Sequence, residues 1–303
     1  MRETNVTSVY DLLGEDYFSK KHRSVEFNND VQRFPIIYAC IHQAKRLNRP
    51  LEELDVLNIG VGGGQQRSDL CICSLGLGCG RVSDHRLVDL DVSQTMLEVA
   101  SELFPSKGFL EKLEKTKENV KQVKGDATDL TRYFNNDSFD IVVAALCDPI
   151  EPQEKMYHGA LKVLKKDGIF ITTYPHKDLA TVIRRNIYHI NLRYTRYKID
   201  DKEYIARSYA PLPEDVSDLF MRTGFTDIQT RTLKADSIFY NEIDPKGMHK
   251  VDDNYWWYGE AGTCPGHRYV IPDTMMKARE KLGLPIGELP VLVFGEGRKP
   301  NND

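Results

Sequence analysis

The chain has 303 residues, of which 41% are hydrophobic and 28% charged, and its formal net charge is −4. This composition is ordinary for a globular protein, and the acidic balance disfavours a nucleic-acid partner, whose binding domain is usually basic. No apolar run is long enough for a membrane span, and the first residues lack the layout of a secretory signal. We therefore expect a cytoplasmic protein without a membrane partner.

The six cysteines are expected to be reduced thiols, because a chain of this length can bury a core without disulfides. Cys71, Cys73 and Cys79 lie close together in "CICSLGLGC". Their C-x-C-x5-C spacing is not one that zinc sites use, and no paired C-x-x-C follows. We therefore predict no metal site.

Apolar runs alternate with helical patterns from residue 55 to residue 175, which indicates an α/β fold with a parallel sheet. Ser93 is expected to cap the helix that carries Met96 and Leu97. A later helix places Met156, Ala160, Leu161 and Leu164 inward. The predicted strands cover residues 55–61, 85–93, 120–123 and 138–148, and a fifth begins at Gly168.

The second half of the chain has a different pattern. A helical face between Leu179 and Ile190 precedes a hairpin that turns at residues 200–202. A short helix then has Pro213 near its start and Gly224 after it. Two more strands are expected at 225–233 and 289–300, whereas the segment between them shows no clear periodicity.

The stretch "LNIGVGGGQQ" ends the first strand with a cluster of glycines. A turn of this kind, at the carboxyl edge of a parallel sheet, is where open α/β sheets bind ligands. Gly60, Gly62 and Gly64 are spaced G-x-G-x-G. This spacing fits neither a phosphate loop nor a dinucleotide fingerprint, so the glycines alone do not name the ligand.

Acidic residues at the next two strand ends define a groove. Asp91 can accept both ribose hydroxyls of a nucleoside, and Asp126 can accept a hydrogen bond from an adenine amine, with Ala127 supplying backbone. The ends of the first, second and third predicted strands would then bind the methionine or phosphate tail, the ribose and the base of a nucleoside ligand, respectively.

This set resembles the class I S-adenosylmethionine-dependent methyltransferases. The motifs "VLNIGVGGG", "LVDLDVSQTMLEVA", "VKGDATDL", "FDIVVAALC" and "LKKDGIFITT" stand in the family's order. The resemblance implies a seven-stranded, mostly parallel sheet with helices on both faces and an antiparallel strand seven. It also implies S-adenosylmethionine as cofactor, held by Gly60, Gly62, Gly64, Asp91, Val92, Met96, Asp126, Ala127, Ala144, Ala145 and Leu146.

Asn58 departs from the family pattern, because the family has an acid two residues before the first glycine, where it helps to hold the methionine ammonium. An amide oxygen accepts a hydrogen bond but cannot neutralise that charge. Asn58 is then either a tolerated variant or a sign that the ammonium is held less firmly in its charged form. The second interpretation suits a cofactor whose own nitrogen acts as the nucleophile.

The resemblance divides the chain into four parts: a helical lid at 1–50, the cofactor core at 51–175, an inserted helix and hairpin at 176–211, and the remaining core at 212–303. The last part carries an aromatic-rich insertion at about 235–288. Tyr17 in the lid is a candidate cofactor contact, although the segment could equally be a packing helix. The aromatic residues 255–258 could face a cation, form a satellite core or serve a homo-oligomer interface.

A general base is needed only if the acceptor must lose a proton. The candidates are Asp148, Tyr174, His176 and Tyr209. The motif that amino-methylating DNA enzymes carry after strand four is absent, which argues against a base-flipping enzyme.

The leading hypothesis is therefore a methyltransferase that acts on O or N of a small molecule. One alternative keeps the cofactor but attacks the methionine γ-carbon, by aminocarboxypropyl transfer or intramolecular cyclisation, and releases methylthioadenosine. A second alternative is an inactive cofactor-binding scaffold.

Overall fold

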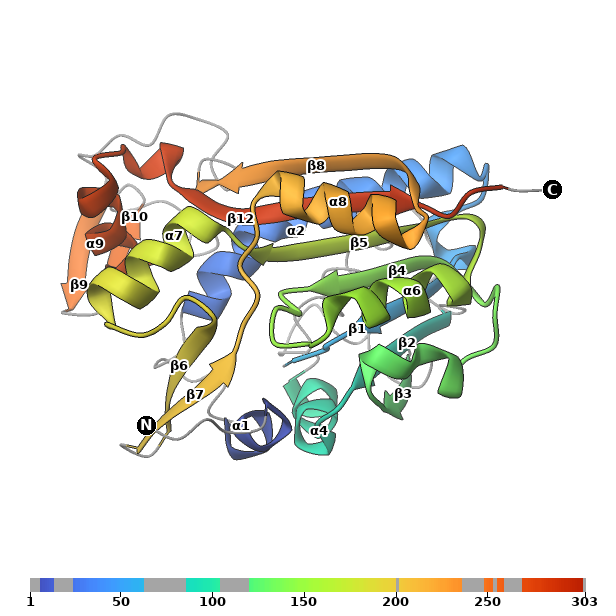
Figure 1. Ribbon diagram of the computed structural model, residues 1–303, viewed down its shortest axis with the longest axis horizontal. Helices are drawn as coiled ribbons and strands as arrows, with labels where there is room; N and C mark the ends of the chain where they lie inside the picture. Colours follow the sequence, from blue (N-terminus) through green and yellow to red (C-terminus); the bar gives the residue numbers. More distant parts are fainter. Residues whose placement is uncertain are drawn as a thin grey trace.

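The computed structural model describes residues 6–13, 24–62, 86–103, 120–199, 202–235, 248–252, 255–258 and 269–301. Its centre is a seven-stranded sheet in the order β3-β2-β1-β4-β5-β12-β8 (Figure 1). The strands are β1 Asp55–Ile59, β2 Arg86–Asp91, β3 Val120–Lys124, β4 Phe139–Ala145, β5 Leu164–Pro175, β8 Thr226–Lys234 and β12 Pro290–Arg298.

The direction of the strands confirms the expected sheet. β1 pairs in parallel with β2 and β4, β2 with β3, and β4 with β5. β12 is antiparallel to both of its neighbours, β5 and β8. All residues of β1 and β4 are buried, which explains why β4 contains a continuous apolar run at residues 141–145.

The fifth strand begins earlier than expected. Leu164, which was predicted to lie on a helix, pairs instead with Phe139 as the first residue of β5. The register resumes with Ile141 opposite Ile169, so the residues between form an irregularity in which Asp167 has a φ of 61°. Leu164 would be buried whether it ended the helix or began the strand. Its hydrophobicity alone therefore could not place the boundary between α6 and β5.

Helices cover both faces of the sheet (Figure 1). α2 Ser24–Arg46 packs on one face, and α6 Gln153–Val163 and α8 Pro213–Thr223 pack on the other. α4 Gln94–Leu103 contacts β2 and β3, and the Ser93 hydroxyl accepts a hydrogen bond from the Met96 N–H, as expected of a cap. None of the helices in the described ranges is long and apolar enough to cross a membrane.

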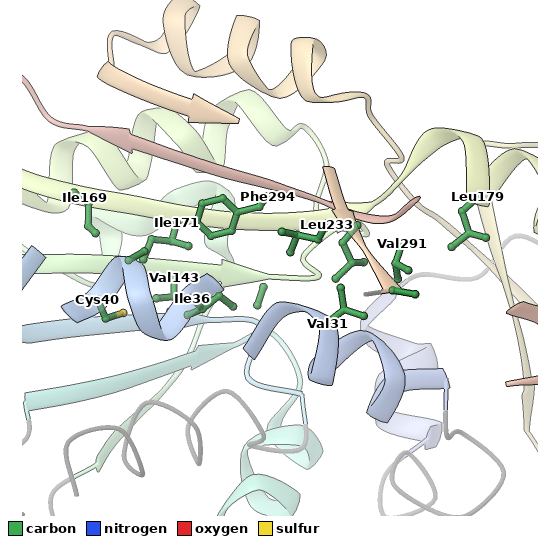
Figure 2. Close-up of a cluster of buried hydrophobic side chains, with 14 of the residues drawn as sticks. Val31, Ile36, Cys40, Val143, Ile169, Ile171, Leu179, Leu233, Val291 and Phe294 are labelled. Atoms are coloured by element: carbon green, nitrogen blue, oxygen red, sulfur yellow. The ribbon is translucent and has the colours of Figure 1, made fainter. Parts of the chain in front are cut away.

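The packing of α2 differs from the lid that the sequence predicts for residues 1–50. Val31, Ile36 and Cys40 of α2 are buried against Val143 and Ile171 of the sheet (Figure 2). This buried face makes α2 part of the main core, and a lid stays a prediction for the residues that precede it. In the described residues that segment contains α1 Val6–Leu13.

A helix and a hairpin occur between residues 176 and 211, where the sequence predicts an insertion. α7 Lys177–Thr181 continues as a π-helix, η5 Val182–Ile187, and the hairpin consists of β6 Tyr194–Ile199 and β7 Lys202–Arg207. The hairpin lies beside α1 (Figure 1).

The segment without periodicity forms regular structure that the sequence did not predict. A three-stranded antiparallel sheet has β10 Tyr255–Tyr258 between β9 Met248–Asp252 and β11 Tyr269–Pro272. α9 Asp273–Leu282 follows it and packs against η5. The remaining short helices are η3 Leu51–Glu53, η4 Ala127–Arg132 and η9 Ile286–Glu288.

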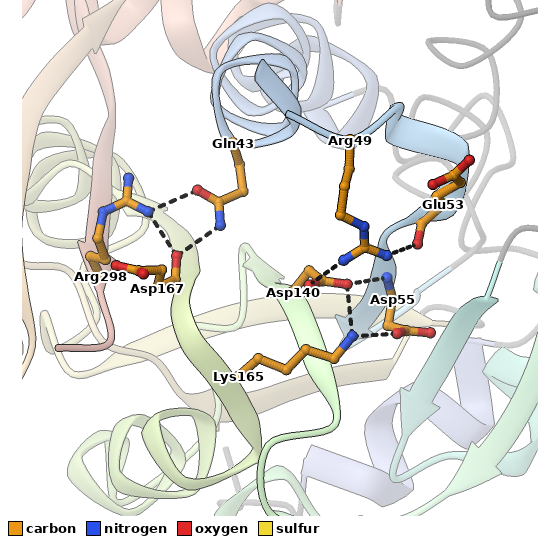
Figure 3. Close-up of polar contacts among 8 residues, drawn as sticks. All are labelled: Gln43, Arg49, Glu53, Asp55, Asp140, Lys165, Asp167 and Arg298. Atoms are coloured by element: carbon orange, nitrogen blue, oxygen red, sulfur yellow. Dashed lines mark hydrogen bonds and ion pairs between the residues drawn. The ribbon is translucent and has the colours of Figure 1, made fainter. Parts of the chain in front are cut away.

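A cluster of charged groups joins the amino ends of three strands (Figure 3). Asp140 of β4 accepts hydrogen bonds from the Asp55 N–H at 2.8 Å, from Lys165 Nζ at 2.9 Å and from the Arg49 guanidinium at 3.0 Å. Lys165 also pairs with the Asp55 carboxylate at 2.5 Å. The cluster therefore stabilises the edge of the sheet opposite to the glycine turn.

A second polar cluster attaches α2 to the sheet (Figure 3). The Arg298 guanidinium donates to Gln43 Oε1 and to the Asp167 carbonyl, each at 2.8 Å, and the Gln43 amide donates to the same carbonyl. These bonds satisfy the backbone where β5 is irregular.

Replacing Lys165 with Met should lower the free energy of unfolding by about 2–4 kcal/mol, because it leaves the buried Asp55 and Asp140 carboxylates without that cation. The control Lys234→Met removes an exposed pair with Glu288 and should cost less than about 1 kcal/mol. Denaturant unfolding monitored by circular dichroism measures both. Equal losses in the two variants would contradict this role for Lys165.

Candidate functional site

The glycine turn lies where β1 ends between β2 and β4. Gly60 and Gly62 have φ angles of 67° and 51°, and the Gly60 N–H donates to the Leu90 carbonyl at 2.8 Å. A Cβ on Gly60 would lie 2.5 Å from Cys147 Sγ. Both the left-handed backbone and the close approach therefore require glycine at position 60. Gly64 lies outside the described residues.

Asp91 stands at the carboxyl end of β2 beside this turn. Its carboxylate accepts hydrogen bonds from the Ser93 N–H at 2.9 Å and from the Gly62 N–H at 3.3 Å. Burial raises the pKa of Asp91 to about 6, and the nearby charge of Asp89 adds to this shift. A ligand that donates hydroxyl hydrogen bonds to this carboxylate would stabilise its charged form.

The expected base-binding residues follow β3. Asp126 is exposed and caps η4, because its Oδ1 accepts a hydrogen bond from the Thr128 N–H at 2.8 Å. Ala127 is buried next to it. The capping bond uses one carboxylate oxygen, so the arrangement is compatible with a second contact through the other.

Met96 and the end of β4 frame the rest of the groove. Met96 is fully buried in a small cluster with Val9 of α1 and Ala206 of β7. Ala144 and Ala145 are buried at the end of β4, and Leu146 follows with a φ of 54°. Val92, next to Asp91, is exposed.

Asn58 forms a buried pair that sequence reasoning missed. Its side-chain amide donates to Asp89 Oδ1 at 3.0 Å, and the two residues are register partners on β1 and β2. Both side chains are buried. Asp89 lies two positions before Asp91, on the same face of β2, and this spacing in "LVDLD" was the signal that could have found it.

Asp148, just after β4, is the centre of a second buried cluster. Ser208 donates its hydroxyl hydrogen to Asp148 Oδ2, and an Arg184 guanidinium nitrogen lies 4.0 Å from the same oxygen. Arg184 also donates to Ser208 Oγ at 2.6 Å. Burial raises the pKa of Asp148 to about 6, although Arg184 and Ser208 oppose the shift. The carboxylate is therefore mostly charged at neutral pH.

The other proton-transfer candidates have structural partners. The fully buried Tyr174 hydroxyl bonds to Gln153 Oε1 at 2.7 Å and lies 3.2 Å from the Tyr157 hydroxyl. His176 caps α7, because its Nδ1 accepts a hydrogen bond from the Asp178 N–H, and burial lowers its pKa. These hydrogen bonds give Tyr174 and His176 structural roles that require no part in catalysis.

Tyr209 lies beside the Asp148 cluster. Its N–H donates to the Asp148 carbonyl at 2.8 Å, and its ring meets the Tyr174 ring edge-on at 5.3 Å. Burial raises the pKa of Tyr209 to about 12, so its hydroxyl stays protonated at neutral pH.

α1 and the hairpin close over the end of β2. The Ser93 hydroxyl donates to the Asp11 carboxylate of α1, while the Ser93 N–H bonds to Asp91. The hydroxyls of Tyr10 on α1 and Tyr197 on β6 lie 3.4 Å apart. Elements far apart in the sequence therefore meet next to the predicted ribose site. Tyr17 lies outside the described residues, as do Cys71, Cys73 and Cys79.

The comparison with protein families decides the assignment. A family described as a methyltransferase domain matches residues 52–211, which is more than half of the chain. The chain belongs to this methyltransferase family. S-adenosylmethionine is its cofactor, and the protein is an S-adenosylmethionine-dependent transferase. No curated protein matches the chain.

Solved structures share the fold. A chain from the complex between the Haloferax volcanii Trm112 methyltransferase activator and a putative methyltransferase has a TM-score of 0.51 at 13% identity, with 99% of this chain and 100% of that chain covered. Haemonchus contortus phosphoethanolamine N-methyltransferase 2, with phosphomonomethylethanolamine and S-adenosylhomocysteine bound, has a TM-score of 0.51 at 18% identity. That alignment covers 98% of this chain but only 61% of the Haemonchus chain. At these identities the likeness concerns the fold alone.

The described residues fit this cofactor. Gly60 lets the backbone turn without a side chain, and Asp91 presents a buried carboxylate at the adjoining strand end. Asn58 Oδ1 is a buried acceptor without a hydrogen-bond partner in the described structure. No group of three or more His, Cys, Asp or Glu side chains suited to a metal occurs among the residues that are described.

Replacing Asp91 with Asn should weaken S-adenosylhomocysteine binding by about tenfold or more, because the ribose hydroxyls lose a charged acceptor. In the unmodified protein, affinity should rise with pH through about 6 as Asp91 loses its proton. The variant should lack this dependence. Titration calorimetry from pH 5 to pH 8 measures both effects.

Glu98→Gln, on the exposed side of α4, is the matched control and should bind like the unmodified protein. An Asp91→Asn variant that keeps full affinity at pH 8 would contradict the assignment of the ribose to Asp91.

Proposed function

We propose that this methyltransferase transfers a methyl group to an oxygen or nitrogen atom of a small molecule. The observation that carries the proposal is that α1, the β6–β7 hairpin and the start of α4 pack against one another beside the predicted ribose site. Val9, Met96 and Ala206 from these three elements are buried against one another. We infer that these elements cover the acceptor side of the cofactor, and such a cover would favour a small ligand over a macromolecule.

The segments added to the central sheet would form the binding site for the methyl acceptor. We assign this role to the insertion at 176–211 and to α1, which contacts both the hairpin and α4. The bond between Asp11 and Ser93 would keep α1 closed over the cofactor side. A lid role for α1, with Tyr17 as a further contact, is part of the proposal.

We assign Asp148 as the group that receives the acceptor's proton. When bound, S-adenosylmethionine supplies an electrophilic methyl group and leaves as S-adenosylhomocysteine. Ser208 and Arg184 both approach Oδ2 of Asp148, which orients the carboxylate and leaves Oδ1 for the proton. A carboxylate with a pKa of about 6 is charged at neutral pH and still basic enough to accept a proton from a polarised N–H or O–H.

The alternative reaction at the methionine γ-carbon rested on the aromatic additions and on Asn58, and it loses the second of these reasons. Asn58 stands where the family has an acid, which would leave the cofactor's ammonium without a nearby negative charge. The Asp89 carboxylate is hydrogen-bonded to Asn58, so an acid is present one strand away. No contact among the described residues favours the γ-carbon reaction or an inactive scaffold, and we retain methyl transfer.

The size of the acceptor can be tested with S-adenosylmethionine labelled in its methyl group. The purified protein is incubated with a cell extract that has been separated by ultrafiltration into a low-mass filtrate and a macromolecular fraction. We expect the label to appear in a filtrate compound. Incorporation only into protein or nucleic acid, and its loss after protease or nuclease treatment, would overturn the proposal.

Asp148→Asn should then reduce labelling of the filtrate by at least about a hundredfold, which is the range of a lost general base. In the unmodified protein, labelling should fall below about pH 6 as Asp148 is protonated. Lys234→Met, which breaks an exposed pair with Glu288 outside the insertion, is the control. If the Asp148→Asn variant labels the filtrate as strongly as the unmodified protein, Asp148 is not the group that accepts the proton.

A further inference from the structure

Asn58 and Asp89 are two polar residues in the buried part of the sheet, immediately before the glycine turn. They are 1% and 0% exposed, respectively, and they lie on neighbouring strands in register. The Asn58 Nδ2 group donates to Asp89 Oδ1 at 3.0 Å. Polar groups in such positions cost stability unless their hydrogen bonds are satisfied, so their presence calls for a reason.

The hydrogen bond to Asp89 fixes the orientation of the Asn58 amide. Because the amide nitrogen must face the carboxylate, Oδ1 faces away from Asp89. The register partner of Asn58 on β4 is Val143, whose side chain has no donor. No donor in the described parts of the chain bonds to Oδ1, which is buried. A buried acceptor is therefore held in a set direction beside the turn that the cofactor requires.

We propose that Asn58 and Asp89 act together to bind the ammonium group of S-adenosylmethionine. Asn58 Oδ1 accepts a hydrogen bond from the ammonium, and Asp89 supplies the compensating negative charge from the adjacent strand. The proposal rests on S-adenosylmethionine being the cofactor and does not depend on the identity of the acceptor.

Two principles favour a hydrogen bond accepted by Asn58 combined with a negative charge from Asp89. A carboxylate hydrogen-bonded to an amide N–H polarises the amide, so the opposite oxygen becomes a stronger acceptor in a site of low dielectric constant. Two carboxylates at these positions would repel each other, and one would take up a proton. An amide on β1 and an acid on β2 therefore keep one negative charge in the pair.

Two ligands that differ only in the ammonium test this directly. S-adenosylhomocysteine carries the group, and its deaminated analogue lacks it, while both retain the nucleoside that Asp91 is expected to bind. The measured quantity is the ratio of their dissociation constants, obtained by titration calorimetry for each variant. This ratio is independent of changes that affect both ligands equally.

In the unmodified protein S-adenosylhomocysteine should bind more tightly than the deaminated analogue. Asp89→Asn and Asn58→Ala should each lower this preference by about tenfold or more, the loss expected for a hydrogen bond to a charged group. The exchange variant Asn58→Asp with Asp89→Asn keeps one amide and one acid on swapped strands. It should restore the preference to within about threefold of the original.

An unchanged preference in Asp89→Asn, measured on folded protein, would overturn the proposal and make the pair structural. A restored melting temperature without a restored preference in the exchange variant would lead to the same conclusion. If the unmodified protein binds neither ligand, the cofactor assignment itself fails, and this outcome is distinguishable from both others.

Discussion

The close packing of Gly60 between β2 and the chain after β4 is the constraint on which the site depends. Its N–H bonds to Leu90, and a side chain there would collide with Cys147. β1 must therefore turn at this residue with a left-handed backbone. That turn brings the Gly62 N–H to 3.3 Å from the Asp91 carboxylate, so this steric requirement places the glycine turn against the residue that is predicted to bind the ribose.

Charge is distributed unevenly along the strands. The amino ends of β1, β4 and β5 are joined by the Asp55, Asp140 and Lys165 cluster, in which acids and bases neutralise one another. The carboxyl ends carry Asp89, Asp91 and Asp148, and burial raises the pKa of the last two. The charges at the amino ends of the strands thus stabilise the fold. The carboxylates at the carboxyl ends are buried, so their charged forms lower the stability unless a ligand or a hydrogen-bond partner compensates them.

The central sheet was predictable because buried parallel strands are rich in apolar residues, as in β1 and in residues 141–145 of β4. The glycine turn and Asp91 were predictable because they follow those runs directly. Asp89 was missed, since an acid inside a strand has no distinctive periodicity and its partner lies 31 residues away. Ser208 was missed for the same reason, being 60 residues from Asp148. The strands between residues 248 and 272 were not predicted, because the segment that contains them shows no clear periodicity.

The nature of the bond broken in the cofactor tests the account most directly. Purified protein is incubated with S-adenosylmethionine, first alone and then with a low-mass cell extract, and the adenosine products are separated and identified by mass spectrometry. The account predicts an intact cofactor without extract, and S-adenosylhomocysteine together with a product heavier by one methylene group when extract is present. Catalytic release of methylthioadenosine would contradict methyl transfer and establish attack at the methionine γ-carbon.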